Sequence, residues 1–203
     1  MATTAVLHPR GEKLVLSDLI PVLRGSRARE VALVLGGAAL TGLSAQISIP
    51  VHGSPVPVTG QTFGVLLVGA ALGARRAAAS MALYLLAGFV GVPWFAGAST
   101  GSIHLATLGY LAGFVLAGAL VGRLAERGAD RSPWRTALTM VLGNLVIYAC
   151  GVPYLAHAAH LSAADALHYG LTVFLLGDAL KILLAAGLLP GAWKLAGRRP
   201  VGH

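Results

Sequence analysis

Six apolar stretches alternate with connecting segments of very different charge, and this alternation most constrains the fold. Every lysine and arginine except Lys181 lies in the N-terminal segment, in or beside the second or fourth connection, or in the C-terminal tail. The first, third and fifth connections contain neither residue. Because the cytoplasmic loops of membrane proteins are enriched in lysine and arginine, the pattern predicts an even number of spans, with both termini in the cytoplasm.

The composition supports a membrane protein. Hydrophobic residues make up 56% of the chain and charged residues 11%, whereas a soluble domain has about 45–50% and about 25%. We therefore expect an all-α integral membrane protein with six transmembrane helices, at about residues 31–49, 61–72, 77–90, 103–124, 136–154 and 169–189. The second is short for the ~20 residues that a bilayer requires, which favours a tilted or re-entrant segment. The topology accounts for the net charge of +8, so no nucleic-acid partner is expected.

The charged ends of the chain divide it into three parts. We expect a cytoplasmic N-terminal segment at residues 1–30, a six-helix domain at 31–193 and a cytoplasmic basic tail at 194–203. A short amphipathic helix is expected at about residues 14–23. Arg10, Glu12 and Lys13 interrupt any hydrophobic core of a cleavable signal peptide. The expected location is the cell membrane of a prokaryote, crossed several times.

Two charged residues lie inside the last apolar stretch, in the sequence Gly177-Asp178-Ala179-Leu180-Lys181. Residues three apart share one face of a helix, so Asp178 and Lys181 can meet. A charge at mid-membrane costs about 3 kcal/mol on insertion scales, and such residues usually face a cavity, a partner or a ligand. The pair is therefore either a structural ion pair between helices or part of a polar binding site.

The sequence lacks the motifs of an enzyme. It contains no Gly-rich loop ending in Gly-Lys-Ser/Thr, no Gly-x-Ser-x-Gly elbow and no His or Cys pair with metal-ligand spacing. We therefore expect neither catalysis nor a bound cofactor or metal, and no binding of ATP by this chain.

The first and third connections differ from the others, since they are rich in proline, glycine and aromatic residues and nearly free of charge. Rigid apolar loops above buried polar groups suit the cover of a small-molecule pocket. Neutral side chains near them can donate or accept hydrogen bonds, either to a ligand or between helices. These are Gln46, Thr59, Gln61, Asn144 and Tyr148.

Four segments together resemble one family. They are Ala45-Gln46-Ile47-Ser48-Ile49-Pro50, Pro55-Val56-Pro57-Val58-Thr59-Gly60-Gln61-Thr62-Phe63, Pro93-Trp94-Phe95-Ala96-Gly97, and Gly177-Asp178 with Lys181. They are similar to BioY, the biotin-binding S component of energy-coupling-factor (ECF) vitamin transporters. The resemblance covers about residues 31–189, and the Pro-Val-Pro-Val-Thr-Gly-Gln-Thr segment is its most specific part. One departure is the start of the fourth span, where the family commonly has Gly-Pro-Thr-Gly-Gly-Tyr and this chain has Leu105-Ala106-Thr107-Leu108-Gly109-Tyr110.

The resemblance implies a function and its partners. It implies a six-helix subunit that captures biotin from outside for ATP-driven import, together with a transmembrane coupling subunit and two ATPase subunits that bind the ATP. Biotin is then the transported ligand, and the lipid bilayer surrounds the chain. The alternative is a self-sufficient carrier or facilitator for a small vitamin, which works without ATPases.

The chemistry of biotin assigns roles to the site. Asp178 would accept a ureido N–H, and Asn144 or Lys181 would donate to the ureido carbonyl. Alternatively, Lys181 would pair with the ligand carboxylate, and the sequence leaves both poses open. The full set of predicted binding residues is Asp178, Lys181, Asn144, Tyr148, Gln46, Phe63, Trp94, Phe95, Thr107 and Tyr110.

Small residues on the first span form a candidate docking face. Ala32 and Gly36 lie four residues apart, a spacing that lets helices approach closely. Packing within the protein explains this spacing equally well. In the family that this chain resembles, such a face docks the coupling subunit, so Ala32 and Gly36 are the predicted docking residues.

Overall fold

The computed structural model describes residues 14–19, 26–101 and 106–197. Over these residues the chain is almost entirely helical, with one two-stranded hairpin. The α-helices are α1 (Arg27–Ala45), α2 (Gln61–Leu72), α3 (Ala74–Phe89), α4 (Leu108–Ala125), α5 (Pro133–Ala158), α6 (Ala163–Gly170) and α7 (Leu175–Gly197). The strands are β1 (Ser48–Ile49) and β2 (Val58–Thr59), and short 3₁₀ turns lie at Leu16–Leu19, Ala96–Ala98 and Thr172–Phe174.

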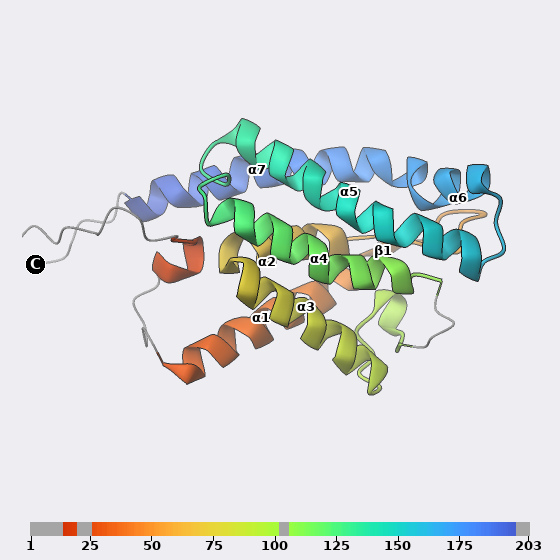
Figure 1. The fold of residues 1–203 in the computed structure, drawn as a ribbon, viewed down its shortest axis with the longest axis horizontal. Coiled ribbons are helices and arrows are strands. Elements are labelled where there is room, and N and C mark those ends of the chain that lie inside the picture. The colour runs from red at the N-terminus through yellow and green to blue at the C-terminus, as the bar shows by residue number, and fades with distance from the viewer. Residues whose placement is uncertain (1–13, 20–25, 102–105, 198–203) are drawn as a thin grey trace, which may run out of the picture.

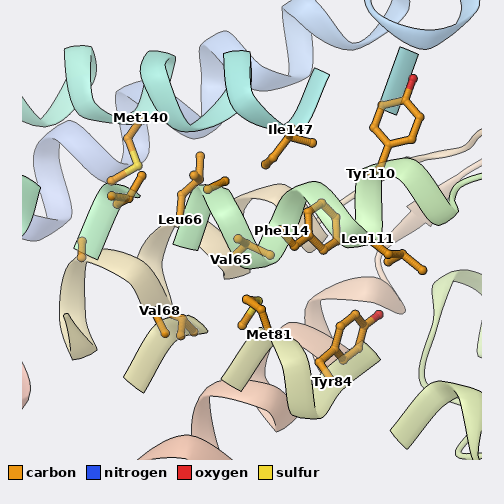
Figure 2. Close-up of a cluster of buried hydrophobic side chains, with 14 of the residues drawn as sticks. Val65, Leu66, Val68, Met81, Tyr84, Tyr110, Leu111, Phe114, Met140 and Ile147 are labelled. Atoms are coloured by element: carbon orange, nitrogen blue, oxygen red, sulfur yellow. The ribbon is translucent and has the colours of Figure 1, made fainter. Parts of the chain in front are cut away.

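The long helices form a bundle around α4. Helix α4 packs against α2, α3 and α5, while α7 packs on α5 and α1 packs on α2 and α3. Figure 1 shows α5 and α7 along one side of α4 and α1 on the other. Helix α4 therefore supplies the centre of the core, which includes Leu111, Phe114, Ala117 and Val121, all at most 3% exposed. Figure 2 shows Leu111 and Phe114 among the buried side chains.

Close approach of α4 and α5 depends on glycine. A Cβ added to Gly109 would lie 2.6 Å from the carbonyl oxygen of Cys150 and would also meet the side chain of Tyr154. On the facing helix, Gly151 leaves room for the ring of Tyr110. Small residues at such contacts allow membrane helices to pack backbone against backbone.

Four helical segments are long and apolar enough to cross a membrane: α1, α4, α5 and the α6–α7 segment. Helix α2 is apolar but has only 12 residues, so it extends about 18 Å, well under a bilayer core of ~30 Å. The expected short second span is thus confirmed. It is preceded by a hairpin in which Ser48 pairs with Thr59 and Ile49 with Val58. These two short strands were not predicted from the sequence.

The sixth span differs from the prediction in its start. The helix expected from residue 169 begins at Leu175, after the short helix α6 and a 3₁₀ turn. Between them, Leu171 leaves helical geometry with φ −136° and ψ −59°. The carbonyl of Gly170, at the end of α6, accepts a hydrogen bond from the Tyr110 hydroxyl at 2.7 Å. The fourth helix begins at Leu108; residues 103–105 of the span predicted there lie outside the described residues.

The positively charged segments gather at one end of the bundle, as the topology prediction requires. In Figure 1 the start of α1, the α2–α3 turn, the α4–α5 loop and the end of α7 all lie at the left. Arg76 in α3 pairs there with Glu30 and Asp18, each at 2.8 Å. The assignment of this end to the cytoplasm remains a prediction. Of the predicted amphipathic helix at 14–23, Leu16–Leu19 forms a single 3₁₀ turn, and residues 20–23 lie outside the described residues, like most of the two predicted tails.

Candidate functional site

The site is built around the ion pair of α7. Lys181 Nζ lies 3.2 Å from Asp178 Oδ1, as the three-residue spacing on one helix face predicted. The Asp178 side chain is only 5% exposed and that of Lys181 17%. Lys181 also donates a hydrogen bond to Thr62 Oγ1 on α2 at 2.9 Å. The pair therefore links α7 to α2 as well as bridging within α7.

The second oxygen of Asp178 is also occupied. The hydroxyl of Tyr148, a buried residue of α5, donates a hydrogen bond to Asp178 Oδ2. Both carboxylate oxygens thus have a donor, which is what a buried charge requires. The result is a polar chain running from α5 to α2 through α7, by way of Tyr148, Asp178, Lys181 and Thr62.

One side of this row of hydrogen-bonded side chains faces a cavity. The cavity has an empty volume of about 460 Å³, part of it open to solvent. Its wall includes residues of the β1–β2 segment, the start of α2, and helices α4, α5 and α7. The lining residues are Val56, Pro57, Thr59, Gln61, Thr62, Ala96, Thr107, Tyr110, Leu111, Phe114, Tyr148, Phe174 and Lys181. Among these lining residues Lys181 alone carries a charge. An apolar cavity with a few convergent polar groups is typical of a small-molecule site.

Two aromatic rings of the wall support each other. The rings of Tyr110 and Tyr148 meet edge to face with centroids 6.4 Å apart, and Phe174 lies 6.4 Å from Tyr148 on the other side. Such pairs hold flat surfaces in a fixed orientation. This part of the wall suits a flat or fused-ring ligand.

Lys181 also lines a second, smaller space behind the first. It has an empty volume of about 180 Å³ and is lined in addition by Phe63, Leu66, Met140, Asn144 and Ile182. Asn144 is 6% exposed, and its Oδ1 has no hydrogen-bond partner among the described residues. An acceptor buried without a donor costs free energy, so Asn144 Oδ1 is an open hydrogen-bond acceptor in this space, which Lys181 also lines.

Of the ten predicted binding residues, six line these two spaces and a seventh, Asp178, bonds to two of the six. Lys181, Tyr148, Thr107 and Tyr110 line the larger cavity, Asn144 and Phe63 line the smaller one, and Asp178 holds Tyr148 and Lys181 in place. Thr107 and Tyr110 keep these positions although the segment before them departs from the family pattern. Leu105, in that segment, lies outside the described residues.

The structure places the other three predicted residues away from the cavity wall. Gln46 Nε2 lies 3.2 Å from the carbonyl of Trp94 and 3.3 Å from that of Phe95, so it binds the backbone of the segment after α3. The Trp94 indole donates to the carbonyl of Tyr84 at 2.9 Å, and Phe95 is 2% exposed. These three residues hold the 90–101 segment, which we call the α3–α4 segment, against α1 and α3; of this segment, Ala96 reaches the cavity.

Several lining residues were absent from the predicted binding set. Thr59, Gln61 and Thr62 belong to the Pro-Val-Thr-Gly-Gln-Thr segment that carries the family resemblance, so their signal was present. Phe114 and Phe174 lie in apolar stretches where any aromatic residue fits lipid or core equally well, and the sequence offers no signal for them. Among the described residues no group of three or more histidine, cysteine or acidic side chains is placed to hold a metal ion.

A solved structure shares this fold. The chain resembles the structure titled "Crystal structure at 2.1 A of the S-component for biotin from an ECF-type ABC transporter", with a TM-score of 0.74, 20% identity, and coverage of 82% of this chain and 92% of that one. At this identity the likeness shows the fold alone, which this chain shares with that S-component. Together with the four apolar segments long enough to span, it makes this chain an all-α, multi-pass membrane protein.

The sequence comparisons agree with the fold. The chain is 36% identical over 159 residues to "Probable biotin transporter BioY" of Pyrococcus horikoshii, covering 78% of this chain and 93% of that protein. It is 37% identical over 150 residues to "Biotin transporter BioY" of Thermotoga maritima, covering 73% and 86%. The BioY family matches residues 16–198, nearly the whole chain. The protein therefore belongs to the BioY family, as its sequence motifs predicted.

Proposed function

We propose that this chain is the biotin-binding subunit of a biotin uptake transporter. The observation that carries the proposal is that Tyr148 and Lys181, both bonded to Asp178, line a mostly apolar cavity. The relatives named above are called biotin transporters. The cavity combines a mostly apolar wall with a few polar groups, as small-molecule sites do.

The groups of biotin match the groups of the wall. Its ureido ring offers two N–H donors and a carbonyl acceptor, and its valerate ends in a carboxylate. Asp178 accepts a ureido N–H, and this requires the Tyr148 hydroxyl to release or share one carboxylate oxygen. The open acceptor of Asn144 suits the second N–H, while Lys181 suits the ureido carbonyl. The rings of Tyr110, Tyr148 and Phe174 would pack on the fused rings of the ligand.

The alternative pose pairs Lys181 with the ligand carboxylate, since no other lining residue of the cavity is a cation. Biotin amide, which lacks the negative charge, separates the two poses. In the carboxylate pose, replacing biotin by its amide weakens binding to the wild type strongly and binding to Lys181→Met only slightly. In the ureido pose, the amide loses the same modest factor in both proteins.

We place the chain in the cell membrane of a prokaryote, as its named relatives come from archaea and bacteria. We further propose that it works with a transmembrane coupling subunit and two ATPase subunits, which bind the ATP. Support comes from a groove along α1, α2 and α7 that is lined by Ala32 and Gly36 together with apolar residues. A Cβ added to Gly36 meets no atom within 4 Å, so this face is not used for packing among the described residues.

The test of the proposed function is equilibrium binding of biotin to the purified protein in detergent, with thiamine and riboflavin as controls. Selective biotin binding supports the proposal, and absence of binding by a folded sample contradicts it. Reconstitution in vesicles without partners tests the coupling. Biotin accumulation by this chain alone would favour the self-sufficient carrier instead.

A further inference from the structure

We propose that Tyr84 of α3, a residue that does not line the cavity, is a positioning residue that couples the cavity wall to the α3–α4 segment. The inference rests on the proposed function, because its role is to retain the bound ligand. Tyr84 is 1% exposed and lies in the same buried cluster as Leu111 and Phe114 (Figure 2). A buried tyrosine places its ring in the core but must find hydrogen-bond partners for its hydroxyl.

The first partner belongs to the cavity. Gln61, at the start of α2, lines the cavity and is 7% exposed. Its Nε2 donates to the Tyr84 hydroxyl at 2.6 Å, while its Oε1 accepts from the hydroxyl of Thr59, another lining residue, at 3.1 Å. The Tyr84 hydroxyl thus fixes the orientation of an amide that faces the ligand space.

The second partner belongs to the α3–α4 segment. The Tyr84 hydroxyl lies 3.2 Å from the carbonyl oxygen of Trp94, to which it donates, and the Trp94 indole donates back to the Tyr84 carbonyl at 2.9 Å. The ring of Tyr84 also contacts the rings of Trp94 and Phe95, each with a centroid distance of 5.1 Å. One hydroxyl therefore joins Gln61 to the backbone of the segment, and one ring joins α3 to two of its side chains.

The α3–α4 segment depends on such bonds for its shape. Ala98 has φ +55°, a left-handed conformation that costs free energy for a residue with a Cβ. Gln46 of α1 stabilises it by accepting a hydrogen bond from the Ala98 N–H at 3.2 Å. Gln46 holds the segment from α1, whereas Tyr84 holds it from α3 and also touches Gln61, so the route from the ligand to the segment runs through Tyr84.

The consequence is that binding of a ligand in the cavity affects how long the ligand is retained there. A ligand that takes a hydrogen bond from Gln61 reorients its amide, and the Tyr84 hydroxyl passes the change to Trp94 and to Ala96 beyond it, which lines the cavity. Tyr84→Phe keeps the ring contacts and removes only this link. We expect biotin to dissociate about 5- to 30-fold faster from Tyr84→Phe, since a buried donor loses its acceptor, with a much smaller change in the association rate.

The matched control is Ser80→Ala, one turn earlier on α3. Ser80 is fully buried, and its hydroxyl has no hydrogen-bond partner among the described residues, so its removal should leave biotin dissociation unchanged. A double-mutant cycle with Gln61→Ala isolates the proposed link. In the Gln61→Ala background, Tyr84→Phe should change the dissociation rate less than twofold.

A second readout does not require biotin. Acrylamide quenching of Trp94 fluorescence, measured in a Trp134→Phe, Trp193→Phe background, reports how firmly the segment is held. Trp94 should be more accessible to quencher in Tyr84→Phe than in Ser80→Ala. If the wild type does not bind biotin, the proposed function fails, and this quenching difference alone decides the role of Tyr84. The inference would be overturned if Tyr84→Phe changed neither the dissociation rate of biotin nor the quenching of Trp94. It would also be overturned if the effects of Tyr84→Phe and Gln61→Ala on the dissociation rate were simply additive.

Discussion

The hydroxyl of Tyr148 on α5 donates a hydrogen bond to Oδ2 of Asp178 on α7, while Oδ1 of the same carboxylate pairs with Lys181 at 3.2 Å. The protein thus satisfies its buried charge with its own side chains. A ligand N–H that binds Asp178 either shares a carboxylate oxygen with Tyr148 or Lys181 or displaces one of them. We therefore expect ligand affinity to depend on all three residues.

We expect Asp178→Asn and Lys181→Met each to weaken biotin binding by at least about 100-fold, because each leaves part of a buried polar chain without its charged partner. Tyr148→Phe keeps the ring in the wall and should weaken binding less, by about 10-fold. The matched control is Lys194→Met, an exposed lysine near the end of the same helix. Equilibrium binding in detergent measures all four. Wild-type affinity in both charge variants would show that the pair is structural only.

Close helix contact gives a prediction about stability. A Cβ on Gly122 of α4 would meet the backbone of Gly73 and Ala74 at the α2–α3 turn, which cannot move aside as a flexible side chain can. We expect Gly122→Ala to lower the free energy of unfolding by roughly 1–3 kcal/mol, seen as a lower melting temperature in detergent. Gly187→Ala on α7, where the added Cβ meets nothing within 4 Å, is the control. Equal melting temperatures for the two variants would contradict this account of the contact.

Much of the site was predictable because charge in an apolar stretch is conspicuous. Asp178 and Lys181 stood out for this reason, and helix geometry alone placed them on one face. The bounds of α2, Gln61–Leu72, also follow directly from the apolar pattern between Gly60 and Gly73. Such features depend on local sequence, so the sequence is enough to find them.

The remaining features depend on contacts between distant residues. Gln46 and Trp94 stand in family motifs, and sequence cannot distinguish a residue that touches a ligand from one that holds the segment beside it. The break between α6 and α7 has no proline to mark it. The Tyr110 hydroxyl that bonds to Gly170 at this break comes from 60 residues away in sequence. The β1–β2 hairpin has two residues in each strand, too few for an alternating pattern to be recognised.

The α4–α5 loop gives a prediction about pH. Asp130 in this loop is fully buried and accepts a hydrogen bond from the Trp193 indole at 2.6 Å, while its Oδ1 has no partner among the described residues. Burial raises the pKa of the Asp130 carboxyl, and the bond from Trp193 opposes this only in part. A raised pKa in the folded state means that folding favours the protonated acid. The favourable contribution is therefore present below the unfolded pKa of about 3.9 and is lost as the pH rises through the folded pKa.

At neutral pH the buried Asp130 carboxylate should therefore reduce stability. We expect Asp130→Asn, which stays neutral and still accepts from Trp193, to melt at a higher temperature than the wild type at pH 7. The difference should shrink as the pH falls toward 4, because the wild-type carboxyl then becomes protonated. Thermal unfolding in detergent between pH 4 and pH 7 measures this. A difference that does not depend on pH, or a less stable Asp130→Asn at pH 7, would contradict it.

Substitutions at two neighbouring glycines of α1 should distinguish docking of a partner from folding of the protein. A Cβ on Gly36 meets nothing within 4 Å, whereas one on Gly37 would lie 2.9 Å from Ser80 Cβ and 3.0 Å from Val68 Cγ1. Both glycines line the groove with Ala32, but Gly36 is exposed, whereas Gly37 is buried against α2 and α3. A bulky residue at position 36 should therefore block a partner without disturbing the fold, while the same residue at position 37 should disturb the fold itself.

We expect Gly36→Leu and Ala32→Leu to bind biotin with wild-type affinity in detergent but to lose most uptake in cells that contain the coupling subunit and the ATPases. Gly37→Leu should lose stability, biotin binding and uptake together, because Leu at this position clashes with α2 and α3. Co-purification of the coupling subunit with each variant measures docking directly. Normal uptake by both Gly36→Leu and Ala32→Leu would move the docking surface away from this face of α1. Loss of biotin binding in Gly36→Leu would show instead that this glycine serves the fold.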